Sequence, residues 1–234
     1  MNPLFLVTAA TSVLLLARQA RGSLLPKGNV PKWQGTQAQI LEEVGKGNYE
    51  LRWMELPGYD GVEVSEDALR IEGIRVPVSA RTLDSLCVML EASPTTPLID
   101  DLIYENATWR VAPRTFNVAD PEAVWRFNAA IDEQLSAQSL GRLAWGLVSS
   151  VGKSWVLSNL ALEHPGRAIN YGLHSPSAPY KSVDGKVKVW QQPSWAHNPD
   201  HADYSQVARL CRLQKGASLP SHEKLKNNLL WIPR

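Results

Sequence analysis

The pattern of apolar and polar positions divides the chain into a hydrophobic N-terminal stretch, a connecting segment and a folded body. Residues 3–17 are apolar and uncharged. Residues 22–35 contain glycines and prolines without periodicity, which is typical of a linker. We therefore expect a separate hydrophobic N-terminal helix over residues 1–21, a linker over 22–35, and a single domain over 36–234.

Within this domain, short alternating runs lie on both sides of a group of helical patterns. The first runs, which predict strands, cover residues 49–54, 61–64 and 69–76. Helices are predicted to begin at the capping residues Thr36, Ser79, Thr96 and Asp120. Strand-like runs return at residues 155–157, 168–171, 186–190 and 205–210. This order predicts an α+β domain with an antiparallel sheet and a central group of helices.

The hydrophobic stretch leaves three interpretations open. As a helix, residues 3–17 would be about 22 Å long, shorter than the roughly 30 Å hydrocarbon core of a bilayer. Arg18 and Arg21 follow it, which favours an N-terminus outside the membrane and a body in the cytoplasm. The stretch could be a membrane anchor or retained signal, a helix buried in an assembly, or a core helix. We expect residues 3–20 to contact a membrane or other protein chains.

Composition narrows the classes of function. Hydrophobic residues make up 44% and charged residues 20% of the 234 residues, as in ordinary globular proteins. The net charge of +1 gives no support to nucleic-acid binding. Trp33, Trp195 and Trp231 lie in polar, proline-rich contexts, where exposed indoles can stack on sugars or pack at interfaces. Cys87 and Cys211 lack CxxC spacing, so we expect buried thiols and no structural zinc knuckle.

Histidines mark residues 150–213 as the region where chemistry is expected. Four of the five histidines fall there, namely His164, His174, His197 and His201. Imidazole titrates near neutral pH and is the commonest metal ligand in proteins. His164 precedes a Pro-Gly turn and is expected to be exposed and inert.

The other three histidines allow two kinds of site, besides a structural role in loops. His174, at the end of a strand, could meet His197 and His201 in a three-histidine zinc site with an open position. Alternatively, one histidine, for which we choose His201, acts as a general base oriented by Asp203, with Ser205, Ser154 or a water as its partner. The candidate residues are His201, Asp203, His174 and Ser154 for catalysis, and His174, His197 and His201 for zinc.

Two further motifs are not sufficient to predict a functional site. Gly152-Lys153-Ser154 looks like the end of a phosphate-binding loop, but Leu147 replaces the required glycine and a strand follows. Asp100 and Asp101 are adjacent carboxylates in a predicted helix. Because sequence neighbours on a helix point in different directions, we expect a solvated surface or a cap there, and no acid–base pair.

Several stretches carry a resemblance. The run Asn170-Tyr171-Gly172-x-His174 and the run His197-x-x-x-His201-x-Asp203-Tyr204-Ser205 resemble a group of uncharacterised bacterial and phage-encoded proteins. The likeness covers about residues 60–213 and leaves out the N-terminal segment. It implies that the histidine region belongs to the domain itself, and it supplies no activity and no residue roles.

These features favour an envelope-associated hydrolase of bacterial or phage origin that acts on peptidoglycan or a related cell-wall polymer through a histidine-centred site. The protein would then be membrane- or envelope-associated, or a component of a virion. The alternative is a non-catalytic structural protein of a virion or membrane-associated assembly. In that case the first helix and the tryptophans would be interface elements. A module that binds a small ligand or a carbohydrate is a third interpretation.

Overall fold

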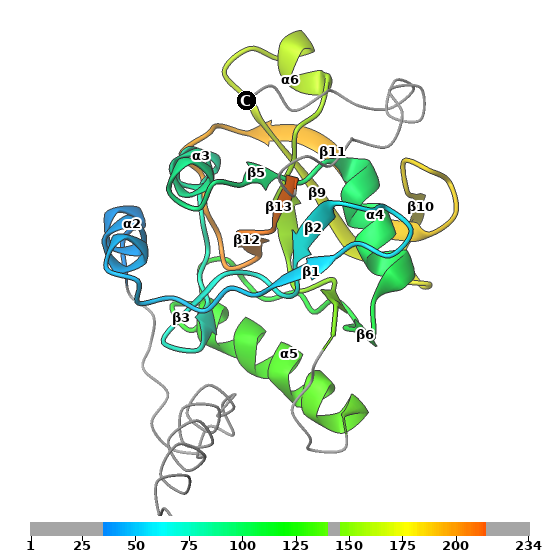
Figure 1. The fold of residues 1–234 in the computed structure, drawn as a ribbon, viewed down its shortest axis with the longest axis horizontal. Helices are drawn as coiled ribbons and strands as arrows, with labels where there is room; N and C mark the ends of the chain where they lie inside the picture. Colours follow the sequence, from blue (N-terminus) through cyan, green and yellow to red (C-terminus); the bar gives the residue numbers. More distant parts are fainter. Residues whose placement is uncertain (1–34, 140–145, 214–234) are drawn as a thin grey trace, which may run out of the picture.

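The computed structural model describes residues 35–139 and 146–213, and these form an α+β fold as predicted. The helix predicted for residues 1–21 and nearly all of the predicted linker lie outside the described residues, as do Trp33 and Trp231. The described helices are α2 (Gln37–Gly45), α3 (Ala80–Met89), α4 (Pro97–Asn106), α5 (Ala123–Gln138) and α6 (Leu160–Glu163) (Figure 1).

Two larger sheets form the centre of the domain. The antiparallel first sheet has the order β1-β2-β13-β5, with strands β1 (Trp53–Glu55), β2 (Val62–Ser65), β13 (Leu210–Leu213) and β5 (Ser93–Pro94). The second has the order β10-β11-β9-β8-β12, with strands β10 (Tyr180–Lys181), β11 (Lys188–His197), β9 (Ala168–His174), β8 (Lys153–Trp155) and β12 (Gln206–Val207). It is antiparallel except where β12 pairs with β8 in parallel.

Two small pairs complete the described strands. β3 (Arg70–Ile71) and β4 (Ile74–Arg75) form an antiparallel hairpin, whereas β6 (Trp109–Arg110) and β7 (Val148–Ser149) pair in parallel. The sequence predicted one continuous strand over residues 69–76. The chain instead turns at Glu72 and Gly73, which both have positive φ (51° and 78°), so the run folds back on itself.

The helices begin largely where their capping residues predict. Thr36, Ser79 and Thr96 each accept a hydrogen bond from the backbone N–H three residues later. These bonds satisfy N–H groups that have no partner within the helix. The helix predicted from Asp120 instead becomes regular at Ala123, because residues 120–122 form a turn in which Asp120 accepts the Glu122 N–H.

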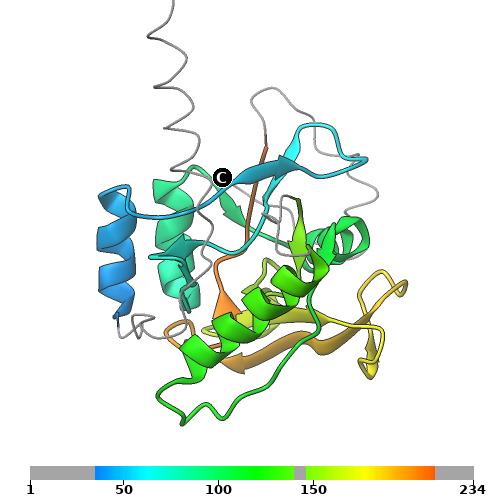
Figure 2. The same cartoon turned by 90° about the horizontal axis from the view of Figure 1, so that it is seen from below.

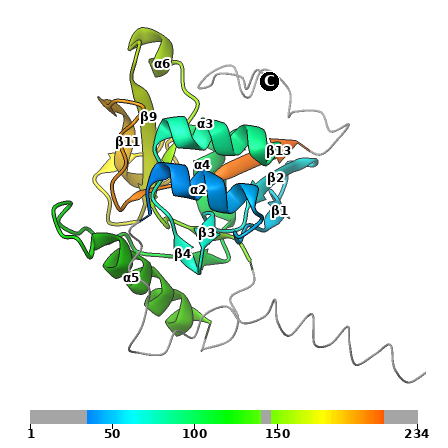
Figure 3. The same cartoon turned by 90° about the vertical axis from the view of Figure 1, so that its left-hand side faces the viewer.

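The helices surround the sheets and place the site. α2 and α3 pack side by side on one flank (Figures 2 and 3). α5 lies below the sheets and contacts β4 (Figure 1). α4 packs directly against β9, and seven of its ten residues are buried. The side chains of α4 therefore meet those of the second sheet in the interior.

A buried arginine ties the β3–β4 hairpin to α5. Arg75 is fully buried, and its guanidinium donates to both carboxylate oxygens of Asp67, at 2.9 and 2.7 Å, and to Asp132 at 2.9 Å. Asn128 of α5 accepts the Arg75 N–H and donates to its carbonyl. Burial alone would raise the pKa of Asp67, but Arg75 and then Arg70 outweigh burial and hold that pKa far below its usual range.

Candidate functional site

Helix α4 presents two rows of side chains to the second sheet. Asp101 and Tyr104 are three residues apart, so they share one face, and both contact His174 of β9. Asp100 and Ile103 form the neighbouring row and line a pocket. Both carboxylates are buried, with Asp100 6% and Asp101 0% exposed. The prediction that these two aspartates are solvated is therefore wrong, because α4 is covered on both of the faces that they occupy.

Asp101 is the centre of a buried hydrogen-bond network. Its Oδ1 atom lies 2.6 Å from the Tyr171 hydroxyl, which donates to it, and 2.7 Å from His174 Nε2. Its Oδ2 atom accepts the backbone N–H of Asp184 at 3.2 Å. The ring of Tyr104 stacks on the His174 ring with centroids 5.1 Å apart. With Nε2 facing a carboxylate, the histidine is held in one orientation, and Nδ1 is its remaining basic nitrogen.

The backbone of β9 explains how Tyr171 and His174 reach the same carboxylate. Residues three apart in a regular strand point to opposite faces. Gly172 and Leu173 between them both have positive φ, 125° and 57°. Leu173 is thus held in a region that non-glycine residues rarely occupy. This irregular segment brings Tyr171 and His174 to one side, toward α4.

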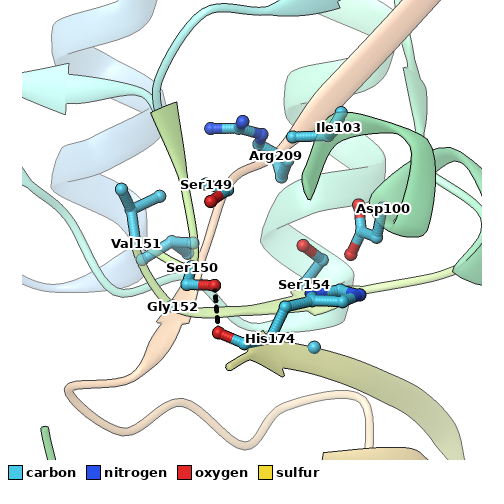
Figure 4. Close-up of a pocket in the computed structure, with 11 residues that line it drawn as sticks. Asp100, Ile103, Ser149, Ser150, Val151, Gly152, Ser154, His174 and Arg209 are labelled. Carbon is cyan, nitrogen blue, oxygen red and sulfur yellow. Dashed lines mark hydrogen bonds between the residues drawn. The ribbon is translucent and has the colours of Figure 1, made fainter. Parts of the chain in front are cut away.

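A small pocket lies beside the Asp101–His174 pair. Asp100, Ser154 and His174 lie together on one side of it, with Arg209 and Ser149 across from them (Figure 4). About 20 Å³ is open to the centres of water-sized molecules, which is enough for a water or one small chemical group. Apolar walls are supplied by Ile103, Val151 and Val207, and the other lining residues are Ser150, Gly152 and Gly172.

The pocket joins two buried groups of opposite charge whose pKa values are both shifted. Burial raises the pKa of Asp100, and the neighbouring Ser154 hydroxyl and the charge of His174 only partly oppose this rise. Burial also lowers the pKa of Arg209, which is 3% exposed. Such shifts in one buried pocket are typical of functional sites, although structural ion pairs produce them too.

Several polar atoms around the pocket lack a hydrogen-bond partner among the described residues. Asp100 Oδ1, Ser149 Oγ and Arg209 Nη1 are all buried and unpartnered. The other terminal nitrogen of Arg209, Nη2, donates to the Val148 carbonyl. Buried polar atoms are normally satisfied, so unpartnered ones that gather at one cavity indicate a place for a polar guest.

The histidine and aspartate favoured by the sequence form a second, more open cluster. The rings of His197 and His201 stack in parallel with centroids 3.9 Å apart. His201 Nε2 lies 3.5 Å from Asp203 Oδ2, and Lys153 Nζ lies 3.7 Å from the same oxygen. The other oxygen of Asp203, Oδ1, accepts the hydroxyl of Ser205 at 2.6 Å. At 3.5 Å the histidine–aspartate contact is weaker than the 2.7 Å contact in the first cluster.

The structure does not bring His174 to the other two histidines, which corrects the three-histidine prediction. His197 pairs with Ala168 at one end of β9, whereas His174 is at the other end. The two positions are six residue steps apart along β9, which corresponds to about 20 Å of extended strand. Within residues 35–139 and 146–213, no group of three or more His, Cys, Asp or Glu side chains is arranged to hold a metal ion.

Strand β8 separates the two clusters. Lys153 faces Asp203, whereas Ser154 faces the pocket with His174, because successive strand residues point to opposite sides. The predicted candidates are thus divided into Ser154 with His174 and His201 with Asp203. Asp100, Asp101 and Arg209 were not predicted as site residues. The signal for Asp101 was a carboxylate between the apolar residues Ile99, Leu102 and Ile103, since a carboxylate buried with them needs partners.

Other residues considered from the sequence, namely the two cysteines and His164, do not line the pocket. Cys87 and Cys211 are buried and free, as expected, and burial raises the pKa of the Cys87 thiol to about 12. His164 stacks on Trp195, with ring centroids 4.1 Å apart. After β8, residues 156–159 come before helix α6, so the glycine-lysine-serine run does not open a helix as a phosphate-binding loop does.

Replacing the Asp100 carboxylate should stabilise the fold in a pH-dependent way. The pKa of Asp100 is raised in the folded state. The carboxyl therefore favours folding at pH values below its unfolded-state pKa of about 3.9. It loses this effect as the pH rises through its folded-state pKa. Asp100→Asn should therefore increase the free energy of unfolding near pH 7.5 and leave it almost unchanged near pH 3.5. Urea unfolding at both pH values measures this, with the exposed Asp60→Asn as control. If Asp100→Asn lowers the free energy of unfolding at both pH values, Arg209 and His174 hold the Asp100 carboxylate in its charged form.

Comparison with protein families, with curated proteins and with solved structures finds no match to this chain. In the part of the chain that the structure describes, none of the helices has the length and apolar character needed to cross a bilayer.

Proposed function

We propose that this protein is a hydrolase that removes an acyl group from its substrate, with the Asp101–His174 pair as its acid–base centre and Ser154 as its nucleophile. The observation that carries this proposal is the buried 2.7 Å contact between Asp101 and His174 beside a pocket that also contains Ser154. A histidine oriented by a carboxylate and placed near a hydroxyl is the arrangement that activates serine nucleophiles.

The proposed reaction has two steps. Ser154 Oγ attacks the acyl carbonyl carbon, the bond from that carbon to the leaving oxygen or nitrogen breaks, and His174 moves the serine proton to the leaving group. A water then attacks the acyl-serine, again through His174, and releases a carboxylic acid and the free hydroxyl. Asp101 does not exchange protons in this scheme. It orients the imidazole and stabilises its charged form.

We further propose a cell-wall polymer as the substrate and an envelope or virion location for the protein. Two indoles on β11 support the first part, since Trp190 is 48% exposed and Trp195, which His164 covers on one face, is 43% exposed. Exposed indoles provide flat apolar faces for sugar rings. The location rests on the hydrophobic residues 3–20, which lie outside the described residues.

A serine-directed probe tests the nucleophile directly. The purified protein should release acid from purified peptidoglycan, and a fluorophosphonate should label Ser154, as located by mass spectrometry. Ser154→Ala should lose both the label and at least about 100-fold of the hydrolysis rate, whereas Ser85→Ala on the exposed face of α3 should keep both. A protein that is neither labelled nor able to hydrolyse any wall preparation would exclude the hydrolase.

The exposed indoles also favour a second candidate, a structural component of a virion or membrane-associated assembly. In that case the buried network around Asp101 would only stabilise the fold. Trp195→Ala would then prevent association with the partner chains, while Ser154→Ala would change nothing but stability. This pair of results would support the structural role over the hydrolase.

A further inference from the structure

The pocket beside His174 is small and buried, and two features of its lining limit what it can bind. It has an apolar wall of Ile103, Val151 and Val207. It also has two unpartnered groups that can donate, Ser149 Oγ and Arg209 Nη1. A guest that fills it must therefore combine a small apolar part with an oxygen that accepts hydrogen bonds.

The two unpartnered donors are buried, which favours a ligand atom that accepts hydrogen bonds from them. Arg209 is 3% and Ser149 is 1% exposed, so bulk water does not solvate them as it would a surface side chain. An unpaired buried donor is unfavourable, and an acceptor in the pocket would remove that cost. In Figure 4 both side chains lie across the pocket from Ser154 and His174. A carbonyl group placed between these two sides would have its oxygen toward Arg209 and its carbon toward Ser154.

We propose that the pocket takes an acyl group no larger than acetyl, with Arg209 and Ser149 donating hydrogen bonds to its oxygen. The inference rests on the proposed function and assigns its substrate class, an acetyl ester or acetyl amide. The methyl group packs on Ile103, Val151 and Val207. During attack by Ser154, negative charge develops on the carbonyl oxygen, and the Arg209 guanidinium stabilises it. Donors aimed at such an oxygen in a water-excluded site are strong contributors to catalysis.

The cavity volume sets the limit on size, and Gly152 allows the chain beside the cavity to pack closely. A Cβ atom built on Gly152 would lie 2.7 Å from the Val207 side chain and 2.8 Å from the Ser205 carbonyl. A Cβ on Gly172 would lie 3.5 Å from the Gly152 carbonyl and 3.9 Å from the Asp100 carboxylate. A side chain at Gly152 would therefore clash with the segment that contains β12, whereas the distances at Gly172 are ordinary contacts. An acyl chain longer than acetyl would exceed the small cavity, in which only about 20 Å³ is open.

Binding of the product acid tests this inference separately from catalysis. Acetate should bind with a dissociation constant of about 1 mM, as measured by calorimetry, and butyrate at least about 10-fold more weakly. Ser149→Ala should weaken acetate binding several-fold without lowering stability, because its hydroxyl has no partner within the described residues. Arg209→Lys should weaken binding about 10-fold or more, whereas Arg81→Met and Ser85→Ala on the surface should not change it.

Each result separates the two proposals. Acetate binding that depends on Ser149 and Arg209 but comes without hydrolysis would keep the acetyl pocket and exclude the hydrolase. Hydrolysis without such binding, or equal affinity for acetate and butyrate, would overturn the acetyl pocket and keep the hydrolase. If Arg209→Lys fails to fold, Ser149→Ala alone decides, and unchanged acetate affinity in that variant would overturn the inference.

Discussion

Asp101→Asn is expected to lower the rate of acyl hydrolysis by roughly 100- to 10,000-fold, because it removes the carboxylate that orients His174. An asparagine can keep the shape of the side chain. However, the groups that donate to the carboxylate in the wild type would then face a neutral amide. It would favour the wrong tautomer of His174 and would no longer stabilise a charged imidazole. The 2.7 Å contact between Asp101 Oδ1 and His174 Nε2 is the geometry that this prediction rests on.

Tyr171→Phe is the matched control for this variant. The Tyr171 hydroxyl donates to the same Asp101 oxygen at 2.6 Å, so its removal disturbs the same buried carboxylate without touching the histidine. We expect Tyr171→Phe to reduce the free energy of unfolding by about 1–3 kcal/mol and to keep most of the hydrolysis rate. If both variants lose activity equally, Asp101 supports the fold and does not orient His174.

The second large effect is expected on the free energy of unfolding when Arg75 is replaced. Arg75→Met should lower the free energy of unfolding by about 3–5 kcal/mol, because it leaves the largely buried carboxylate of Asp67, which is 16% exposed, without its main partner. Urea unfolding near pH 7 measures this. Arg81→Met is the control, because Arg81 and its partner Asp200 are both solvent-exposed, and its unfolding midpoint should hardly move.

The Arg75 prediction also has a pH signature. The pKa of Asp67 is lowered in the folded state, so its ion pair stabilises the protein above its unfolded pKa of about 3.9. That stabilisation is lost as pH falls through the lower folded value. The difference in stability between the wild type and Arg75→Met should therefore shrink as pH falls below about 4. A difference that stays constant with pH would mean that packing of the arginine stem, and not its charge, stabilises the hairpin.

Much of the secondary structure could be predicted because it depends on neighbours in the sequence. The starts of α2, α3 and α4 follow from Thr36, Ser79 and Thr96, whose side chains bond to a backbone N–H three residues away. The turn at Gly73 was missed because residues 69–76 alternate in polarity across it. Strand pairing was predicted only as antiparallel, and the parallel pairs β8–β12 and β6–β7 join segments far apart in the chain.

The site was harder to predict because its partners are distant in the sequence. Asp101 and His174 are 73 residues apart, and no local pattern connects them. Sequence proximity favoured His201 with Asp203, which do lie near each other but in a more open cluster at 3.5 Å. Gly172 could have indicated this arrangement, since a glycine inside a strand often marks an irregular backbone. The positive φ angles of Gly172 and Leu173 are what bring Tyr171 and His174 to the same carboxylate.

The two histidine clusters can be compared in one experiment. His174 belongs to the buried pair with Asp101, and His201 lies beside Asp203 on the other side of β8. Glutamine replaces each ring with a polar side chain that cannot act as a base at neutral pH. Both variants would be checked for folding by urea unfolding before the assay.

The most direct test is the initial rate of acetate release from acetylated peptidoglycan by His174→Gln and by His201→Gln, each relative to the wild type. We expect His174→Gln to lose at least about 100-fold and His201→Gln to stay within about twofold. A His174→Gln protein that is folded and fully active, or a loss confined to His201→Gln, would contradict the assignment of the Asp101–His174 pair as the acid–base centre.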